Sequence, residues 1–235
     1  MKKVHRFFAP VAVAGERATI GDPAVAHQAA RVLRLKEGEE IWACPGDGRA
    51  FRVALTSVRP EGLEGRIVAR AMDAAEPSRD VALWCSLLKR EHFEQVVEQA
   101  TQIGVREIRP IIFRRTIKTG ANLERLQKIA REAAETAGRS RLPAIHEPAV
   151  FAAALKMRDV ARAGWLFDLE AESPVQAAKL VPGQGVDVLV GPEGGLEPEE
   201  IRMAFGAGWN AYGLSGLTFR AETAAAVASY MAVSA

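Results

Sequence analysis

The residues best suited to chemistry lie in two loops near the carboxyl terminus. The first is Gly191-Pro192-Glu193-Gly194-Gly195, and the second runs from Leu214 to Arg220. Glycine lets a backbone approach a ligand closely, but neither loop matches the Walker A pattern or the GxGxxG dinucleotide pattern. Glu193 also disfavours a phosphate ligand, whose negative charge it would repel. The first loop therefore suits a neutral or cationic ligand held by backbone groups. Taken alone, it is equally consistent with a tight turn.

Each loop follows a strand-like run and precedes a predicted helix. The runs are residues 186–190, which are apolar enough for a buried parallel strand, and residues 211–214. Pro198 fits the first turn of a helix over 199–205, and a last helix begins near Glu222. Open parallel sheets bind ligands at the carboxyl ends of their strands. We therefore expect both loops to line one site.

Residues 81–235 alternate between strand-like and helix-like patterns. Strands are predicted over 81–87, 105–113 and 164–167, and helices over 93–103, 123–136 and 150–156. This alternation is typical of a parallel α/β domain. The polar stretch 73–80 reads as a linker to a smaller domain.

Residues 1–72 read as mostly β, with short alternating runs separated by turn residues. A small closed or nearly closed barrel is the natural interpretation. One helix is predicted from Ala24 to Leu33, with Val25, Ala29 and Val32 on one face.

The composition of the 235 residues excludes several classes of protein. Two cysteines far apart give no disulfide framework, and four histidines scattered without ligand spacing predict no metal site. No apolar stretch is long enough to span a membrane. Pro10 interrupts the short apolar stretch near the start, so we predict a first strand of a cytoplasmic protein rather than a signal peptide.

The net charge of +2 hides a local asymmetry. Residues 106–141 hold ten Lys/Arg against four Asp/Glu, and residues 1–72 hold twelve against eight. A basic patch is the usual footprint of nucleic-acid binding, although a solvated charged face remains the alternative.

The two loops together resemble the paired signature of the RsmE family, the 16S ribosomal RNA (uracil-N3) methyltransferases of the SPOUT superfamily. The family pattern is close to IGPEGG and then LG-x-x-ILRTETA, matched here by 190–196 and 214–224. Weaker matches at His5-Arg6-Phe7-Phe8, Lys89 and 132–143 extend the resemblance over the whole chain. The departures Ser215, Leu217, Phe219 and Ala221 affect the fine geometry of the second loop.

This resemblance implies a fold, a cofactor and partners. The expected fold is α/β: a SPOUT-type parallel sheet with a deep trefoil knot over 81–235, plus a PUA-like β-barrel that binds RNA over 1–72. The cofactor implied is S-adenosyl-L-methionine. The implied partners are a second copy of the chain, forming a homodimer, and the 16S rRNA of an assembled or nearly assembled small subunit.

The resemblance and the strand ends together give candidate site residues. Arg220 is expected to stabilise the uracil anion or clamp the substrate, or else to brace the loops by pairing with Glu222 or Glu193. Glu222 is a candidate general base or helix cap. Cofactor contacts are expected at Leu166, Asp168, Gly191, Pro192, Glu193, Gly194, Leu214, Ser215, Leu217, Phe219 and Thr223. RNA contacts are expected at Arg6, Arg34, Lys89, Arg114, Arg115, Arg139 and Arg141.

Other functions remain open at this point. The chain could be a non-catalytic RNA-binding or ribosome-assembly protein, or a SPOUT methyltransferase acting on another RNA. A different nucleotide-binding α/β enzyme is disfavoured because both phosphate-binding patterns are missing.

Overall fold

The computed structural model divides the chain into two compact units. The structure describes residues 4–171, 173–175, 178–214 and 217–235, with all of their side chains except that of Arg90. The first unit comprises Met1–Glu76 and Ala134–Leu142, and the second comprises Pro77–Ala133 and Pro143–Ala235. The predicted domain boundary lay at residues 73–80, with all of 81–235 in the second domain. The structure instead groups Ala134–Leu142 with the first unit.

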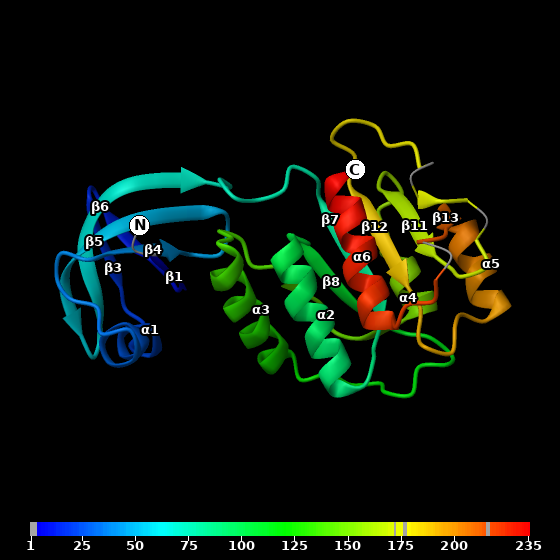
Figure 1. Cartoon of the computed structure of the whole chain (residues 1–235), viewed down its shortest axis with the longest axis horizontal. Helices are drawn as coiled ribbons and strands as arrows, with labels where there is room; N and C mark the ends of the chain where they lie inside the picture. Colours follow the sequence, from blue (N-terminus) through cyan, green and yellow to red (C-terminus); the bar gives the residue numbers. More distant parts are fainter. Residues whose placement is uncertain (1–3, 172, 176–177, 215–216) are drawn as a thin grey trace. The chain divides into compact units, whose positions relative to one another are not determined.

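The first unit is built on a six-stranded sheet (Figure 1). β1 pairs with β4 in parallel, and the other pairs are antiparallel. Phe7, Ile41, Val53 and Leu63 are fully buried in its core, which includes residues of α1. In sheet order the strands are β1 (His5–Phe8), β4 (Glu40–Cys44), β5 (Arg49–Arg59), β6 (Gly62–Met72), β3 (Arg17–Ile20) and β2 (Ala12–Ala14).

The predicted helix over 24–33 forms as two different helical turns. α1 (Pro23–His27) begins with Asp22, whose carboxylate accepts from the backbone N–H groups of Ala24 and Val25. The chain then widens into the π-helix η1 (Gln28–Val32), in which the Leu33 N–H donates to the Gln28 carbonyl. The prediction that Val32 packs on the buried face is wrong, because this residue in the π-turn is 66% exposed.

Side chains expected in the linker hold Ala134–Leu142 to the first unit. Glu76 and Arg139 form a buried ion pair at 2.8 Å, and the same carboxylate accepts from the N–H groups of Ser140 and Arg141. Asp73 accepts two hydrogen bonds from the Arg141 guanidinium, at 2.6 and 2.9 Å. Burial raises the pKa of Glu76, but Arg139 and the two N–H groups outweigh burial and leave that pKa below its ordinary value.

The second unit confirms the prediction of a parallel α/β arrangement. Every described strand pair in its sheet is parallel, and β9 (Ala144–Ile145) adds to β8 beside the main path. In sheet order the strands are β10 (Ala149–Val150), β8 (Glu107–Ile112), β7 (Val81–Ser86), β12 (Val186–Val190), β11 (Ala163–Phe167) and β13 (Trp209–Tyr212).

Helices cover both faces of this sheet (Figure 1). Val186, Val188 and Val190 of β12 pack on one face with residues of α2 (Arg90–Ile103), α3 (Leu123–Ala137) and α6 (Ala221–Ser234). Leu189 packs on the other face with residues of α4 (Phe151–Leu155) and α5 (Pro198–Gly206). This alternation follows from the period of two along a strand. No described helix has the length and apolarity needed to cross a membrane.

Candidate functional site

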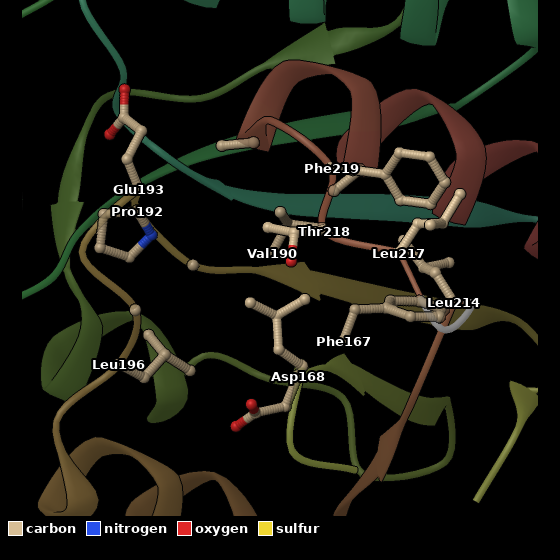
Figure 2. Close-up of a pocket in the computed structure, with 15 residues that line it drawn as sticks. Phe167, Asp168, Val190, Pro192, Glu193, Leu196, Leu214, Leu217, Thr218 and Phe219 are labelled. Atoms are coloured by element: carbon tan, nitrogen blue, oxygen red, sulfur yellow. The ribbon is translucent and has the colours of Figure 1, made fainter. Parts of the chain in front are cut away.

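A pocket opens at the carboxyl ends of β11 and β12, where the sequence predicted a ligand site (Figure 2). Its space is about 830 Å³, including the part that is open to solvent. All of its lining comes from the second unit. The fifteen lining residues are Phe167, Asp168, Leu169, Val190, Gly191, Pro192, Glu193, Gly195, Leu196, Leu214, Leu217, Thr218, Phe219, Ala221 and Ala224.

Two glycines of the first loop suit its shape. A Cβ atom at Gly191 would lie 3.1 Å from the Leu196 side chain, which would have to shift by a few tenths of an ångström. Gly195 has a φ of +72°, in the left-handed region that side-chain-bearing residues avoid, and its N–H donates to the Pro192 carbonyl at 2.9 Å. The loop is therefore a tight turn whose backbone lies against the pocket.

The helix that follows this loop is tied to it. The N–H of Glu197 donates to the Glu200 carboxylate at 2.8 Å, and the other oxygen of that carboxylate accepts from the N–H of Arg114. Arg115 donates to the Gly194 carbonyl at 2.6 Å and to the Glu197 carboxylate at 2.9 Å. The chain that leaves β8 thus fixes the glycine loop and the first turn of α5.

The opposite wall of the pocket is built from the segments after β11 and β13. The N–H of Asp168 donates to the Tyr212 carbonyl at 3.2 Å, and the N–H of Gly213 donates to the Ser173 carbonyl at 2.9 Å. Leu214 and Phe219 then contribute apolar surface to the pocket (Figure 2).

The pocket is apolar with negative charge at its margin. Its described lining contains the carboxylates of Asp168 and Glu193 and no lysine or arginine. Burial raises the pKa of the nearby Cys85 thiol at the end of β7, and the negative charges of Glu193 and Glu222 raise it further. Such a lining matches a ligand with an apolar body and a positive charge, and it opposes a phosphate.

Seven predicted cofactor residues line the pocket and three described ones do not. Leu166 is fully buried on the opposite face of the sheet, and Thr223 is exposed on α6 outside the lining. Gly194 is occupied as the acceptor for Arg115. Ser215 lies outside the described residues. The seven that line the pocket are Asp168, Gly191, Pro192, Glu193, Leu214, Leu217 and Phe219.

Other lining residues were missed, although the strand and helix periods contain the signal for several of them. Phe167 and Val190 are register partners at the ends of β11 and β12 and face the pocket together. Taking the last residue of each strand would have selected Phe167 instead of Leu166. Ala221 and Ala224 stand three residues apart on one helix face, which excludes Thr223 between them. Leu169 and Leu196 were also missed, whereas Gly195 and Thr218 lie in the two predicted loops but were not named as contacts.

The two candidate catalytic residues lie at the start of α6. Arg220 is the exposed residue before the helix, between the lining residues Phe219 and Ala221. Within the described residues, no ion pair joins Arg220 to Glu222 or Glu193, so the alternative bracing role is not observed. The Glu222 carboxylate instead lies 3.2 Å from Nδ1 of His92.

The candidate RNA-binding residues differ in their availability. Arg34, Lys89 and Arg114 are exposed, whereas the half-buried Arg6 guanidinium lies over the Trp42 ring. Arg141 and Arg115 are engaged by the hydrogen bonds given above. The expectation of an exposed Arg139 is wrong, because its side chain is only 2% exposed and is paired with Glu76.

The fold and the site define a class of protein: an α/β ligand-binding unit whose parallel sheet carries its pocket at the carboxyl edge, joined to a smaller β unit. Comparison with protein families matches residues 75–233 to the RNA methyltransferase domain family. The chain is 31% identical to ribosomal RNA small subunit methyltransferase E of a Synechocystis species, over 86% of this chain and 68% of that protein.

Solved structures show the same relationship. Ribosomal RNA small subunit methyltransferase E from Neisseria gonorrhoeae, bound to S-adenosyl methionine, superposes with a TM-score of 0.89 at 25% identity, covering 97% of this chain and 96% of that one. A methyltransferase from Legionella pneumophila shares the fold, with a TM-score of 0.85 at 24% identity, covering 99% and 98%. The chain therefore belongs to the RNA methyltransferase domain family, in its small-subunit methyltransferase E (RsmE) branch.

Proposed function

We propose that this chain transfers a methyl group from S-adenosylmethionine to N3 of one uridine in 16S ribosomal RNA. The observation that carries the proposal is the pocket: the two loops that resemble the family signature meet there around an apolar, acid-flanked space. The pocket lies in a chain whose relatives include a ribosomal RNA small subunit methyltransferase E.

The residues present fit this cofactor. Adenine is a flat, weakly polar ring, and Leu214 and Leu217 offer it apolar surface. Asp168 and Glu193 provide negative charge for the cationic part of the ligand. When bound, S-adenosylmethionine supplies an already activated methyl group on a sulfonium.

The tasks left to the protein are orientation and the handling of one proton. Removing the proton from uracil N3 places negative charge on the two neighbouring carbonyl oxygens. We assign stabilisation of that charge to Arg220, whose exposed position beside the pocket leaves it available to substrate.

We further propose that RNA phosphates contact the exposed Arg34, Lys89 and Arg114, with additional contacts from Arg6 and Arg141. The first unit would serve as the PUA-like, barrel-forming RNA-binding domain; its six-stranded sheet and its arginines support this role. The substrate would be an assembled or nearly assembled small subunit in the cytoplasm, because a chain of this size offers little surface for reading sequence in naked RNA.

A trefoil knot and a homodimer complete the proposal. β13 pairs with β11 at the edge of the sheet, yet α6, which follows β13 along the chain, packs with residues of β12 and β7. This return of the chain from β13 toward β12 and β7, together with the pairing of 173–174 with Gly213, supports a knot. A second copy would cover α6, which is rich in alanine and exposes 63% of Tyr230.

The test is methyl transfer by the purified chain. Small subunits that lack the modification are incubated with methyl-labelled S-adenosylmethionine, and the rRNA is mapped by mass spectrometry. We expect one 3-methyluridine, formed faster on subunits than on naked 16S rRNA. Labelling of another atom, or of another RNA only, would contradict the proposal.

Arg220→Ala tests the assigned cation. We expect its rate to fall about 100-fold near neutral pH, as for loss of one charge-stabilising donor, and to recover in part at high pH, where uracil ionises unaided. Binding of S-adenosylhomocysteine should persist in calorimetry. Arg202→Ala, on the exposed surface of α5, is the matched control and should leave the rate unchanged. A joint loss of cofactor binding and thermal stability in Arg220→Ala would point to bracing instead.

A further inference from the structure

A histidine–glutamate pair lies at the carboxyl edge of the sheet, outside the described lining of the pocket. Nδ1 of His92 in the first turn of α2 is 3.2 Å from a carboxylate oxygen of Glu222 in the first turn of α6. The Nδ1 atom is buried and forms no hydrogen bond with a described residue, so Glu222 is the polar group that stands closest to satisfying it. The Glu222 side chain is 12% exposed, whereas that of His92 is 30% exposed.

The pair is adjacent to the pocket through α6. Ala221 and Ala224, which flank Glu222 on α6, line the pocket. Cys85, at the end of β7, feels the negative charges of both Glu222 and the lining residue Glu193. The two carboxylates therefore both lie near the end of β7.

We propose that His92 accepts the N3 proton of the target uridine and that Glu222 positions the His92 imidazole for this step. The inference rests on the proposed function. The carboxylate holds hydrogen on the buried Nδ1, which leaves Nε2 as the basic nitrogen. The N3–H proton passes to Nε2, and the N3 electron pair forms the new bond to the methyl carbon. The carbon–sulfur bond breaks with its electron pair on sulfur, and the imidazolium then releases its proton to water.

His92 is suited to this role by chemistry and by place. Imidazole is the side chain that exchanges protons near neutral pH, whereas carboxylates as a class are weaker bases. His146, the other histidine of the second unit, pairs with Glu107 at the start of β8, away from the carboxyl edge. Among the described residues, the charged group in contact with His92 is Glu222. Along the chain, Lys89 precedes α2, Glu91 stands next to His92, and Arg220 precedes α6.

The first experiment compares methyl transfer by His92→Ala with the wild type across pH. We expect kcat to fall about 100-fold at pH 7, the lower end for loss of a general base. The rate of the variant should then rise about tenfold per pH unit, because only ionised uracil reacts. Added imidazole should restore part of the rate, and calorimetric affinity for S-adenosylhomocysteine should be unchanged. His146→Ala removes the matched histidine–glutamate pair and should keep wild-type kinetics.

The second readout requires no activity. In the wild type, nitrogen NMR shifts of the His92 ring should show hydrogen on Nδ1, and Glu222→Gln should remove that preference. His92→Gln, which keeps a polar side chain of similar size, guards against misfolding and should lose rate as His92→Ala does.

Three results would overturn the proposal. The first is a wild-type kcat for His92→Ala. The second is a fall in the rate of His92→Ala that is the same at every pH and is not rescued by imidazole. The third is an NMR result that places the hydrogen of the wild-type His92 ring on Nε2. A wild-type chain that methylates no RNA overturns the proposed function, and this inference with it. An active wild type with an equally active His92→Ala variant overturns this inference alone.

Discussion

The two ends of the parallel sheet differ in whether their carboxylates are paired with arginines. At the amino end, Asp187 of β12 is buried, with Arg162 at 2.6 Å and Arg158 at 3.2 Å. The Arg158 guanidinium also lies 4.8 Å from the centre of the Trp209 ring. At the carboxyl end, Asp168 and Glu193 line the pocket, and neither forms an ion pair with any described residue.

This difference separates structural charge from charge available to a ligand. A buried carboxylate without a partner is strongly destabilising, so Asp187 requires its arginines once the fold excludes water. The pocket carboxylates remain near solvent and need no partner within the protein. The buried ion pairs of Asp187 are therefore structural, whereas the charges of Asp168 and Glu193 are left available to a ligand.

The largest expected effect comes from breaking the amino-end network. Asp187→Ala leaves the Arg158 side chain, which is 2% exposed, buried beside Arg162 without a carboxylate. We expect the free energy of unfolding to fall by about 3–5 kcal/mol, measured by urea denaturation. Glu199→Ala breaks an exposed ion pair with Arg202 and should change the free energy of unfolding by less than about 0.5 kcal/mol. Equal effects of the two variants would refute the distinction.

The next largest effect tests the carboxyl end. Gly191→Trp places a ring against Leu196 and into the pocket, although the backbone at Gly191 can hold a side-chain-bearing residue. We expect S-adenosylhomocysteine to bind at least about 100-fold more weakly, a loss of about 2.7 kcal/mol. The melting temperature should stay near that of Gly206→Trp, where nothing lies within 4 Å of the added Cβ. Undiminished binding would remove the cofactor from this pocket.

Local patterns were sufficient to predict the parallel α/β arrangement and the edge of the sheet at which a pocket opens. Strands such as 186–190 are short apolar runs, and the loop that follows is rich in glycine, so both can be recognised without knowing the fold. The parallel order then placed both loops at one edge. Local patterns could not predict which side chains face the pocket. The choice between Leu166 and Phe167 depends on the strand register, in which Phe167 is the partner of Val190.

Long-range pairing could not be predicted in the same way. Residues 134–142 comprise the end of α3 and the segment that follows it, yet they group with the first unit, to which Arg139 is joined by its pairing with Glu76 across a separation of 63 residues. A single sequence contains no signal for that pairing. Arg139 therefore looked like one more exposed cation in a basic stretch. The π-turn at 28–32 could not be predicted either, because the sequence was read with the period of a regular α-helix. That period placed Val32 on the buried face, whereas the residue is exposed.

The smallest expected effect concerns Arg115. The sequence predicted that it contacts RNA, whereas in the structure its side chain is hydrogen-bonded to the glycine loop. Its side chain is 46% exposed, so solvent weakens its bonds to the Gly194 carbonyl and to Glu197. We expect Arg115→Ala to weaken S-adenosylhomocysteine binding about fivefold, close to 1 kcal/mol, because the loop loses its brace.

Arg114→Ala is the matched control, because Arg114 is also exposed and its backbone N–H, which the substitution keeps, is the group that donates to Glu200. That variant should keep its cofactor affinity. If it removes one phosphate contact, it should instead lower the slope of log RNA affinity against log salt by about 0.7–0.9. The two neighbouring arginines would then serve the two functions separately, one holding the cofactor loop and the other the RNA. Arg115→Ala with full cofactor affinity and the reduced salt slope would instead return Arg115 to the RNA-binding surface.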